Sequence, residues 1–95
     1  MTVFWTNAAL DPLLALRDFL STTSAAYAER TVDRLLRRGD QIADVPRSGR
    51  IVPEYGQADV REAVERPYRI LYRIGPERIE VLAVLHGARP LPATL

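Results

Sequence analysis

The spacing of apolar residues changes from helical in the N-terminal half to alternating in the C-terminal third. Residues 2–6 (TVFWT) precede the helical part, and their β-branched and aromatic side chains predict a short strand. Residues 10–20 then carry apolar side chains at helical spacing, which predicts an amphipathic helix. Its apolar stripe consists of Leu10, Leu13, Leu14, Phe19 and Leu20.

Pro12 complicates the start of this first helix. Proline lacks a backbone N–H and is tolerated best in the first helical position. Either Asp11 caps the helix and Pro12 is its first residue, or the first turn is distorted.

A second helix is predicted from about Ser24 to Asp44, where another apolar stripe runs at helical spacing. Gly39 weakens this helix late in its course, and Pro46 ends it. The short polar link between the two helices predicts an antiparallel helical hairpin. The stripe consists of Ala25, Ala28, Val32, Leu35, Leu36, Ile42 and Val45, and the outer face carries Arg30, Asp33, Arg34, Arg37, Arg38 and Gln41.

The C-terminal third is rich in β-forming residues and follows one long loop, residues 46–59. Strands are predicted at 60–65, 68–74 and 79–86, and residues 68–74 alternate most regularly. The order of elements is therefore β-α-α-β-β-β. It predicts an α+β fold in which an antiparallel sheet packs against the N-terminal helical hairpin.

The last hairpin suggests which side chains share a face of the sheet. If the turn GPER joins the strands, Ile74 faces Ile79. Arg69 then lies opposite Val84 and has His86 as its diagonal neighbour, within reach of a long side chain. Arg69 and His86 are thus expected on the exposed face. The remaining predicted pairs, on the face toward the helices, are Tyr72 with Val81, Ile70 with Ala83 and Tyr68 with Leu85.

These positions allow one hypothesis of catalysis. Arg69 could stabilise a phosphorane-like charge, His86 could act as an acid, and Glu54 in the preceding loop could act as a base. Together they would suit RNA cleavage by the 2′-hydroxyl. The alternative is structural: Arg69 pairs with Glu62 or Glu80, and His86 merely ends a strand. Spacing alone favours the structural interpretation.

Composition narrows the class of protein. A chain of 95 residues, 47% of them hydrophobic, is expected to form one domain over residues 1–95. It has no cysteine, which excludes disulfides and thiolate metal sites, and we expect no metal and no cofactor. No apolar run is long enough to cross a membrane, and the N-terminus does not resemble a signal peptide. We therefore expect a cytoplasmic protein.

Charge gives a weak indication of the partners. The formal net charge is +1, from 13 basic and 12 acidic residues, and every basic residue is an arginine. Arg34, Arg37 and Arg38 could contact nucleic acid. A solvated helix face is the favoured interpretation, because acidic residues are interspersed with these arginines.

Four stretches of the chain resemble the RelE/ParE toxin superfamily. They carry the motifs GRxVPE, RE, YRIxYR and HGAR, each weak alone but fairly specific in this order and spacing. Together with the helices they cover nearly the whole chain. The stretches are VFWTNAA (3–9), PRSGRIVPE (46–54), REAVERPYRILYRI (61–74) and VLHGARPLP (84–92).

The resemblance implies a bacterial toxin of a type II toxin–antitoxin system, with growth inhibition and plasmid stabilisation as its roles. Such a toxin is neutralised by a cognate antitoxin, whose C-terminal segment folds on binding. We expect this segment to be acidic and apolar, because exposed arginines need carboxylate partners. The predicted antitoxin-binding residues are Arg50, Arg61, Arg69, Arg73 and Arg89.

The superfamily divides by mechanism. ParE-like members poison DNA gyrase, whereas RelE-like members are endoribonucleases that cut messenger RNA on the ribosome. This sequence resembles the ParE-like members more, because it has no lysine and no tyrosine after its last strand. We therefore expect a gyrase inhibitor that is not an enzyme. The alternatives are a RelE-like nuclease using Glu54, Arg69 and His86, and a non-toxic or divergent interaction domain.

Overall fold

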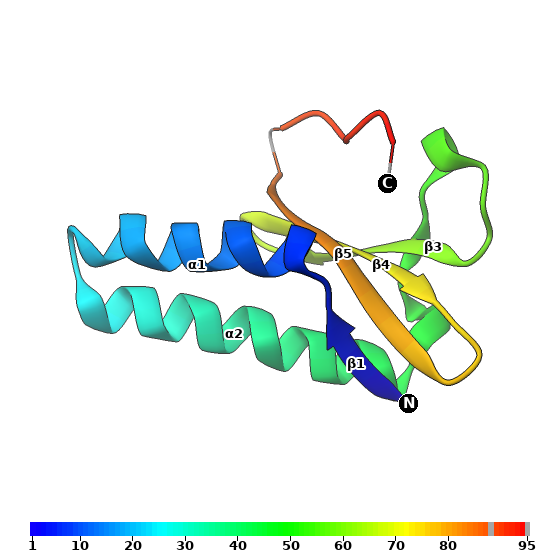
Figure 1. The fold of residues 1–95 in the computed structure, drawn as a ribbon, viewed down its shortest axis with the longest axis horizontal. Helices are drawn as coiled ribbons and strands as arrows, with labels where there is room; N and C mark the ends of the chain where they lie inside the picture. The colour runs from blue at the N-terminus through cyan, green and yellow to red at the C-terminus, as the bar shows by residue number, and fades with distance from the viewer. Residues whose placement is uncertain (88, 95) are drawn as a thin grey trace.

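The computed structural model describes residues 1–87 and 89–94 and has the predicted α+β architecture (Figure 1). Two antiparallel helices form a long hairpin that extends past one end of the sheet. Ala88, within the HGAR motif, and Leu95 lie outside the described residues. The elements are β1 (Thr2–Trp5), α1 (Asn7–Ser21), α2 (Ala25–Asp44), the 3-10 turn η1 (Pro46–Ser48), β2 (Arg50–Ile51), the 3-10 turn η2 (Pro53–Tyr55), β3 (Val60–Glu65), β4 (Tyr68–Ile74) and β5 (Arg78–His86).

The five strands form one sheet in the order β1-β5-β4-β3-β2. Three of the four pairings are antiparallel, but β1 runs parallel to β5, so the prediction of an antiparallel sheet is wrong for this pair. The helical hairpin separates β1 from the other strands along the chain, and a long crossover of this kind permits parallel pairing. The two-residue strand β2 lies inside the predicted loop. It was not predicted, because two residues are too few to show alternation.

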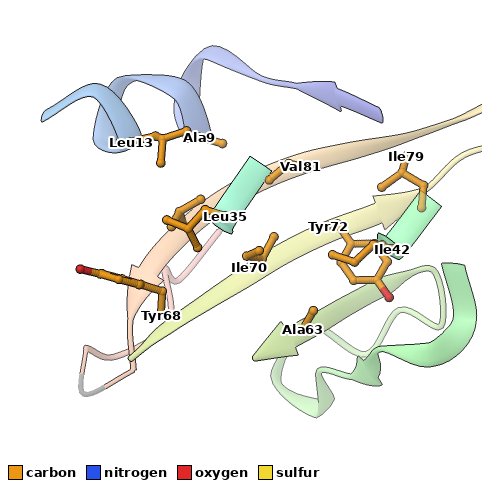
Figure 2. Close-up of a cluster of buried hydrophobic side chains, with 11 residues drawn as sticks. Ala9, Leu13, Leu35, Ile42, Ala63, Tyr68, Ile70, Tyr72, Ile79 and Val81 are labelled. Atoms are coloured by element: carbon orange, nitrogen blue, oxygen red, sulfur yellow. The ribbon is translucent and has the colours of Figure 1, made fainter. Parts of the chain in front are cut away.

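The helical hairpin covers one face of the sheet, and the main core lies between them (Figure 2). On β4 the alternation predicted this face correctly, since Tyr68, Ile70 and Tyr72 all point into the core. Ile79 and Val81 of β5 join them. The helices contribute Ala9, Leu13, Leu35 and Ile42, and β3 contributes Ala63.

Helix α1 starts earlier than predicted. Thr6 precedes its first residue, and the Thr6 hydroxyl donates to the Val81 carbonyl at 2.7 Å, which fixes the first turn against β5. Pro12 lies inside the helix on its exposed side, so neither interpretation of its start is correct. Phe19, predicted to be in the core, is 72% exposed.

Helix α2 closely follows its prediction. Ser24 caps it, accepting a hydrogen bond from the Tyr27 N–H at 3.2 Å. Gly39, however, has a packing role that the sequence did not indicate. A Cβ atom there would lie 3.0 Å from Cζ2 of Trp5, so glycine allows α2 to approach β1 closely. Three residues of the predicted stripe are exposed, namely Ala25, Leu36 and Val45.

The register between β4 and β5 departs from the prediction halfway along the hairpin. Ile74 pairs with Ile79 and Tyr72 with Val81, as predicted. A β-bulge then leaves Leu82 unpaired, and the remaining pairs shift by one residue. The predicted pairing of Arg69 with Val84 is therefore wrong. The observed pairs beyond the bulge are Leu71 with Ala83, Ile70 with Val84, Arg69 with Leu85 and Tyr68 with His86.

Candidate functional site

The face of the sheet opposite the helices carries a buried ion-pair centre. The Glu62 side chain on β3 is only 3% exposed and accepts hydrogen bonds from two arginines. Arg50 Nη2 lies 2.8 Å from Glu62 Oε2, and Arg69 Nε lies 2.5 Å from Glu62 Oε1. The structural alternative for Arg69, pairing with Glu62, is thus confirmed.

The charge state of this centre follows from its partners. Burial alone would raise the pKa of the Glu62 carboxyl, but hydrogen bonds from Arg69 and Arg50 outweigh it and lower that pKa below its usual value. Glu62 is therefore ionised at neutral pH. Its single negative charge is shared by Arg50 and Arg69, and it holds the guanidinium of Arg69, whose side chain is 17% exposed. Arg69 is consequently a poor candidate for stabilising a developing phosphorane charge.

His86 does not share a face with Arg69. It pairs with Tyr68 on the helix side of the sheet, and the two rings meet edge to face with centroids 6.1 Å apart. Neighbouring residues of a strand point to opposite faces, so Arg69 points away from His86. Both residues nevertheless border one hollow of about 410 Å³ at the end of the strands. The predicted shared face is wrong because of the bulge at Leu82.

Glu54 lies on a different element from both of these residues, the turn η2. It is exposed in η2, beside Tyr55, whose hydroxyl donates to the Pro92 carbonyl at 2.6 Å. In the described part of the chain, no hydrogen bond or ion pair joins Glu54 to Arg69. The proposed base, charge stabiliser and acid thus lie on a loop and on two different faces of the sheet.

The loop between α2 and β3 is held in place by side chains whose role there was not predicted from the sequence. Tyr72 is fully buried, and its hydroxyl donates to the Pro46 carbonyl at 2.6 Å and accepts from the Gly49 N–H at 3.1 Å. Burial raises the pKa of the Tyr72 hydroxyl, which keeps it protonated as a donor. The sequence contains one signal of this contact, a tyrosine at a core position of a regular strand. A buried tyrosine hydroxyl needs a hydrogen-bond partner, so a nearby loop could be expected to supply one.

The five predicted antitoxin-binding arginines have different surroundings. Arg61 donates to three backbone carbonyls of the loop at 2.9–3.1 Å. Arg73 Nε lies 3.7 Å from an Asp59 carboxylate oxygen, and Arg50 and Arg69 bind Glu62. Four of the five thus have partners within the chain. Arg89 is exposed beyond the end of β5.

A groove of about 610 Å³ lies between α1 and the ends of β4 and β5. Most of its lining is apolar, whereas His86 and Arg89 also border it. The exposed Phe19 forms part of its wall. The groove was not predicted from the sequence, because Phe19 belongs to the apolar stripe of α1 and was expected to face the core. The lining includes Pro12, Leu16, Phe19, Tyr68, Leu85 and Arg89.

The C-terminal residues cover a small second core on the face opposite the helices. Val52 and Leu71 are fully buried there, and Leu91 of the tail packs against this cluster. The hydrogen bond from Tyr55 to Pro92 holds the tail beside η2 (Figure 1). The tail therefore shields apolar residues near the Glu62 centre from water.

The described residues offer neither a metal-ligand cluster nor a helix that could span a membrane. Among residues 1–87 and 89–94, no three histidine, cysteine or carboxylate side chains gather as metal ligands would. None of the helices described combines the length and the apolar character needed to span a bilayer.

Comparison with known proteins places this architecture among toxin–antitoxin proteins. A chain of the "Chromosomal ParDE TA system from P. aeruginosa" has the same fold, with a TM-score of 0.73, 22% identity, and coverage of 90% of this chain and 95% of that one. "Toxin RelE2" of Caulobacter vibrioides is 34% identical over 88 residues, which are 92% of this chain and 96% of the relative. Residues 3–91 match the family described as "ParE toxin of type II toxin-antitoxin system, parDE". The chain belongs to this ParE toxin family, within the RelE/ParE superfamily.

Proposed function

We propose that this toxin arrests growth by poisoning DNA gyrase, as a binding protein and not as a nuclease. The observation that carries the proposal is the dispersal of the three nuclease candidates over a loop and two faces of the sheet. General acid–base cleavage of RNA requires such groups to converge on one phosphate. Membership of the ParE toxin family supports the same mechanism.

The ion pair of Arg69 adds a second argument. Its guanidinium is bound by a carboxylate that is itself nearly inaccessible to solvent. A cation that stabilises a transition state must direct its N–H groups at the developing charge, whereas Arg69 Nε is directed at Glu62. Arg69 is therefore assigned here to stabilising the fold and not to catalysis.

The second candidate function is cleavage of messenger RNA on the ribosome. The name of the Caulobacter vibrioides relative, "Toxin RelE2", favours it. In that case Glu54 would act as base, Arg69 as charge stabiliser and His86 as acid. Arg69 and His86 border one hollow from two strands, and Glu54 lies on the turn η2, so the ribosome would have to complete their arrangement.

Growth arrest by a double variant separates the two mechanisms. Glu54→Gln combined with His86→Ala removes the proposed base and acid, and both residues are exposed, so the fold is expected to persist. Gyrase poisoning predicts that the induced variant arrests growth as strongly as the wild type and still triggers a DNA-damage reporter. Full loss of arrest in a variant with unchanged thermal stability would instead support the nuclease.

We further propose that the groove between α1 and β5 binds the apolar part of the cognate antitoxin. Its lining is mainly apolar and Phe19 is 72% exposed, which suits an amphipathic segment. Arg89 and His86 at its border fit carboxylates on that segment. Of the five arginines expected to bind the antitoxin, Arg89 is thus the best placed to do so.

Replacing Phe19 by alanine is expected to weaken antitoxin binding by about 2 kcal/mol or more, as for a central aromatic anchor. Stability should change by less than about 0.5 kcal/mol, because the side chain is exposed. Titration calorimetry with the cognate antitoxin measures this effect. Phe4→Ala is the control, since Phe4 is also exposed but lies on β1, outside the groove. Equal affinities for both variants would exclude the groove as the main interface.

A further inference from the structure

The outer face of α2 has a basic flank and an acidic flank, although basic and acidic residues alternate along its sequence. At about 100° per residue, its four arginines fall within an arc of about 100° on one flank. Its acidic residues occupy the adjacent arc, so residues that alternate along the chain are separated in space. The arginines are Arg30, Arg34, Arg37 and Arg38, and the acidic residues are Glu29, Asp33, Asp40 and Asp44.

The arginine flank of α2 faces the turn between β3 and β4. Arg34 Nε lies 3.3 Å and Arg38 Nε 3.8 Å from the carboxylate oxygens of Glu65, the last residue of β3. Arg34 also donates to the Arg66 carbonyl at 3.0 Å. These contacts place Arg66 beside the flank. The arginine strip, as we call it, consists of Arg30, Arg34, Arg37, Arg38 and Arg66.

This strip carries a surplus of positive charge. Glu65 is shared by Arg34 and Arg38, so one carboxylate serves two guanidinium groups. Over the part of the chain that the structure covers, Arg30, Arg37 and Arg66 form no ion pair. Asp33 is the nearest acidic neighbour on the helix, where it borders a shallow hollow with Arg30 and Arg37. These three arginines are exposed, which agrees with the predicted solvated face, and their guanidinium groups are not held by ion pairs with the interspersed acids.

We propose that the arginine strip binds the phosphate backbone of DNA. Guanidinium groups form paired hydrogen bonds with phosphate oxygens and retain their charge. Arg30 and Arg37 are seven residues apart, which is about 10 Å along the helix and close to three nucleotide steps of one strand. The backbone of Arg66 adjoins this line, because its carbonyl accepts a hydrogen bond from Arg34. Such a line suits a regular polyanion better than a single carboxylate.

The α2 arginines of the strip line neither the groove nor the Glu62 centre, whereas Arg66 borders the hollow that Arg69 and His86 also line. DNA binding by the strip would not depend on which enzyme the toxin inhibits. No base-specific contact follows from the strip, because phosphate contacts position a protein without reading sequence. We therefore expect weak, sequence-independent binding with a strong dependence on salt.

Fluorescence anisotropy of a labelled 20-base-pair duplex with the purified full-length toxin tests this proposal. The variant Arg30→Gln, Arg37→Gln, Arg66→Gln removes three cations that have no ion pair to lose. It should weaken binding at least tenfold at low salt and reduce the slope of log K against log salt by about 2–3. The control changes Arg17, Arg47 and Arg78 to glutamine, which lowers the net charge from +1 to −2 equally but away from the strip. It is matched in charge, and the ion pairs that it removes, Arg17 with Asp18 and Arg78 with Glu80, lie at the surface. The control should keep most of the affinity and the slope.

Three results would overturn the proposal. One is the absence of salt-dependent binding by the wild type, and another is an equal loss in both triple variants, which would indicate net charge alone. The third result concerns a labelled polyglutamate peptide. It would have to bind the wild type as tightly as the duplex does, and to bind the variant with the same three substitutions more weakly. The strip would then be a site for an acidic protein. Circular dichroism of both variants checks that the fold is retained.

Discussion

Replacing Glu62 by alanine is expected to destabilise the protein by about 3–5 kcal/mol, the usual cost of removing one partner from a buried ion pair. Arg50 is 68% exposed and can turn toward water, but Arg69 would stay largely buried with its charge uncompensated. Urea denaturation at pH 7 measures the free energy of unfolding. Glu77→Ala, at an exposed glutamate in the turn between β4 and β5, serves as the control and should change it by less than about 0.5 kcal/mol.

The same ion pair makes the loss of stability in Glu62→Ala depend on pH. The pKa of Glu62 is lowered in the folded protein from its ordinary value of 4.5, so the folded state prefers the ionised carboxyl. The resulting stabilisation is complete above the unfolded pKa and is lost as the pH falls through the folded pKa. The stability difference between wild type and Glu62→Ala should therefore shrink below about pH 4.5. A difference that stays constant from pH 7 into that acidic range would show that the charge of Glu62 is not the cause.

Gly49→Ala is expected to produce the second large loss of stability. A Cβ atom at this position would lie 2.2 Å from the Tyr72 hydroxyl oxygen and 2.9 Å from the Glu62 carbonyl oxygen. Neither atom can move easily, because Tyr72 is fully buried and the Glu62 carbonyl belongs to β3. Overpacking costs about 1–3 kcal/mol, and breaking the Tyr72 hydrogen bonds to Pro46 and Gly49 would cost a similar amount.

A double-mutant cycle with Tyr72→Phe identifies the origin of the Gly49 effect. Removing the hydroxyl relieves the closest clash, so the two substitutions should cost clearly less together than the sum of their separate effects. Thermal denaturation of the four proteins gives the interaction energy. Ser48→Ala, beside Gly49 and exposed, controls for general disturbance of the loop. Strict additivity would mean that the Tyr72 hydroxyl does not set the requirement for glycine.

Much of the fold was accessible from the sequence because its elements have clear periodicity. Helix α2 carries an apolar stripe over five turns and a serine cap, and its predicted bounds differ from the observed ones by one residue. Strand β4 alternates without interruption, so its core face was predicted correctly. The order of elements then limited the architecture to a sheet packed against a helical hairpin.

The features that the sequence did not predict depend on contacts between distant residues. The bulge at Leu82 has no glycine to mark it, and it moved His86 to the opposite face from Arg69. The exposure of Phe19 depends on how far α1 extends past the end of the sheet. The parallel pairing of β1 and the two-residue strand β2 likewise have no local pattern of their own.

For the candidate site, the resemblance identified the family correctly but could not assign roles to its arginines. Arg69 was proposed for catalysis and for antitoxin binding, and the structure shows it bound to Glu62. Arg61 donates to loop carbonyls and so stabilises the segment carrying the GRxVPE motif. A motif arginine therefore indicates family membership without showing whether its side chain faces a partner or its own chain.

The most direct test of gyrase poisoning is a supercoiling and DNA-cleavage assay with purified gyrase and this toxin, run beside a cleavage assay on ribosome-bound messenger RNA. We expect inhibited supercoiling and trapped, cleaved DNA, with the messenger RNA intact. Adding the cognate antitoxin should reverse the inhibition. Cut messenger RNA with unaffected gyrase would contradict the proposal and would make Glu54, Arg69 and His86 the candidates for a catalytic site assembled on the ribosome.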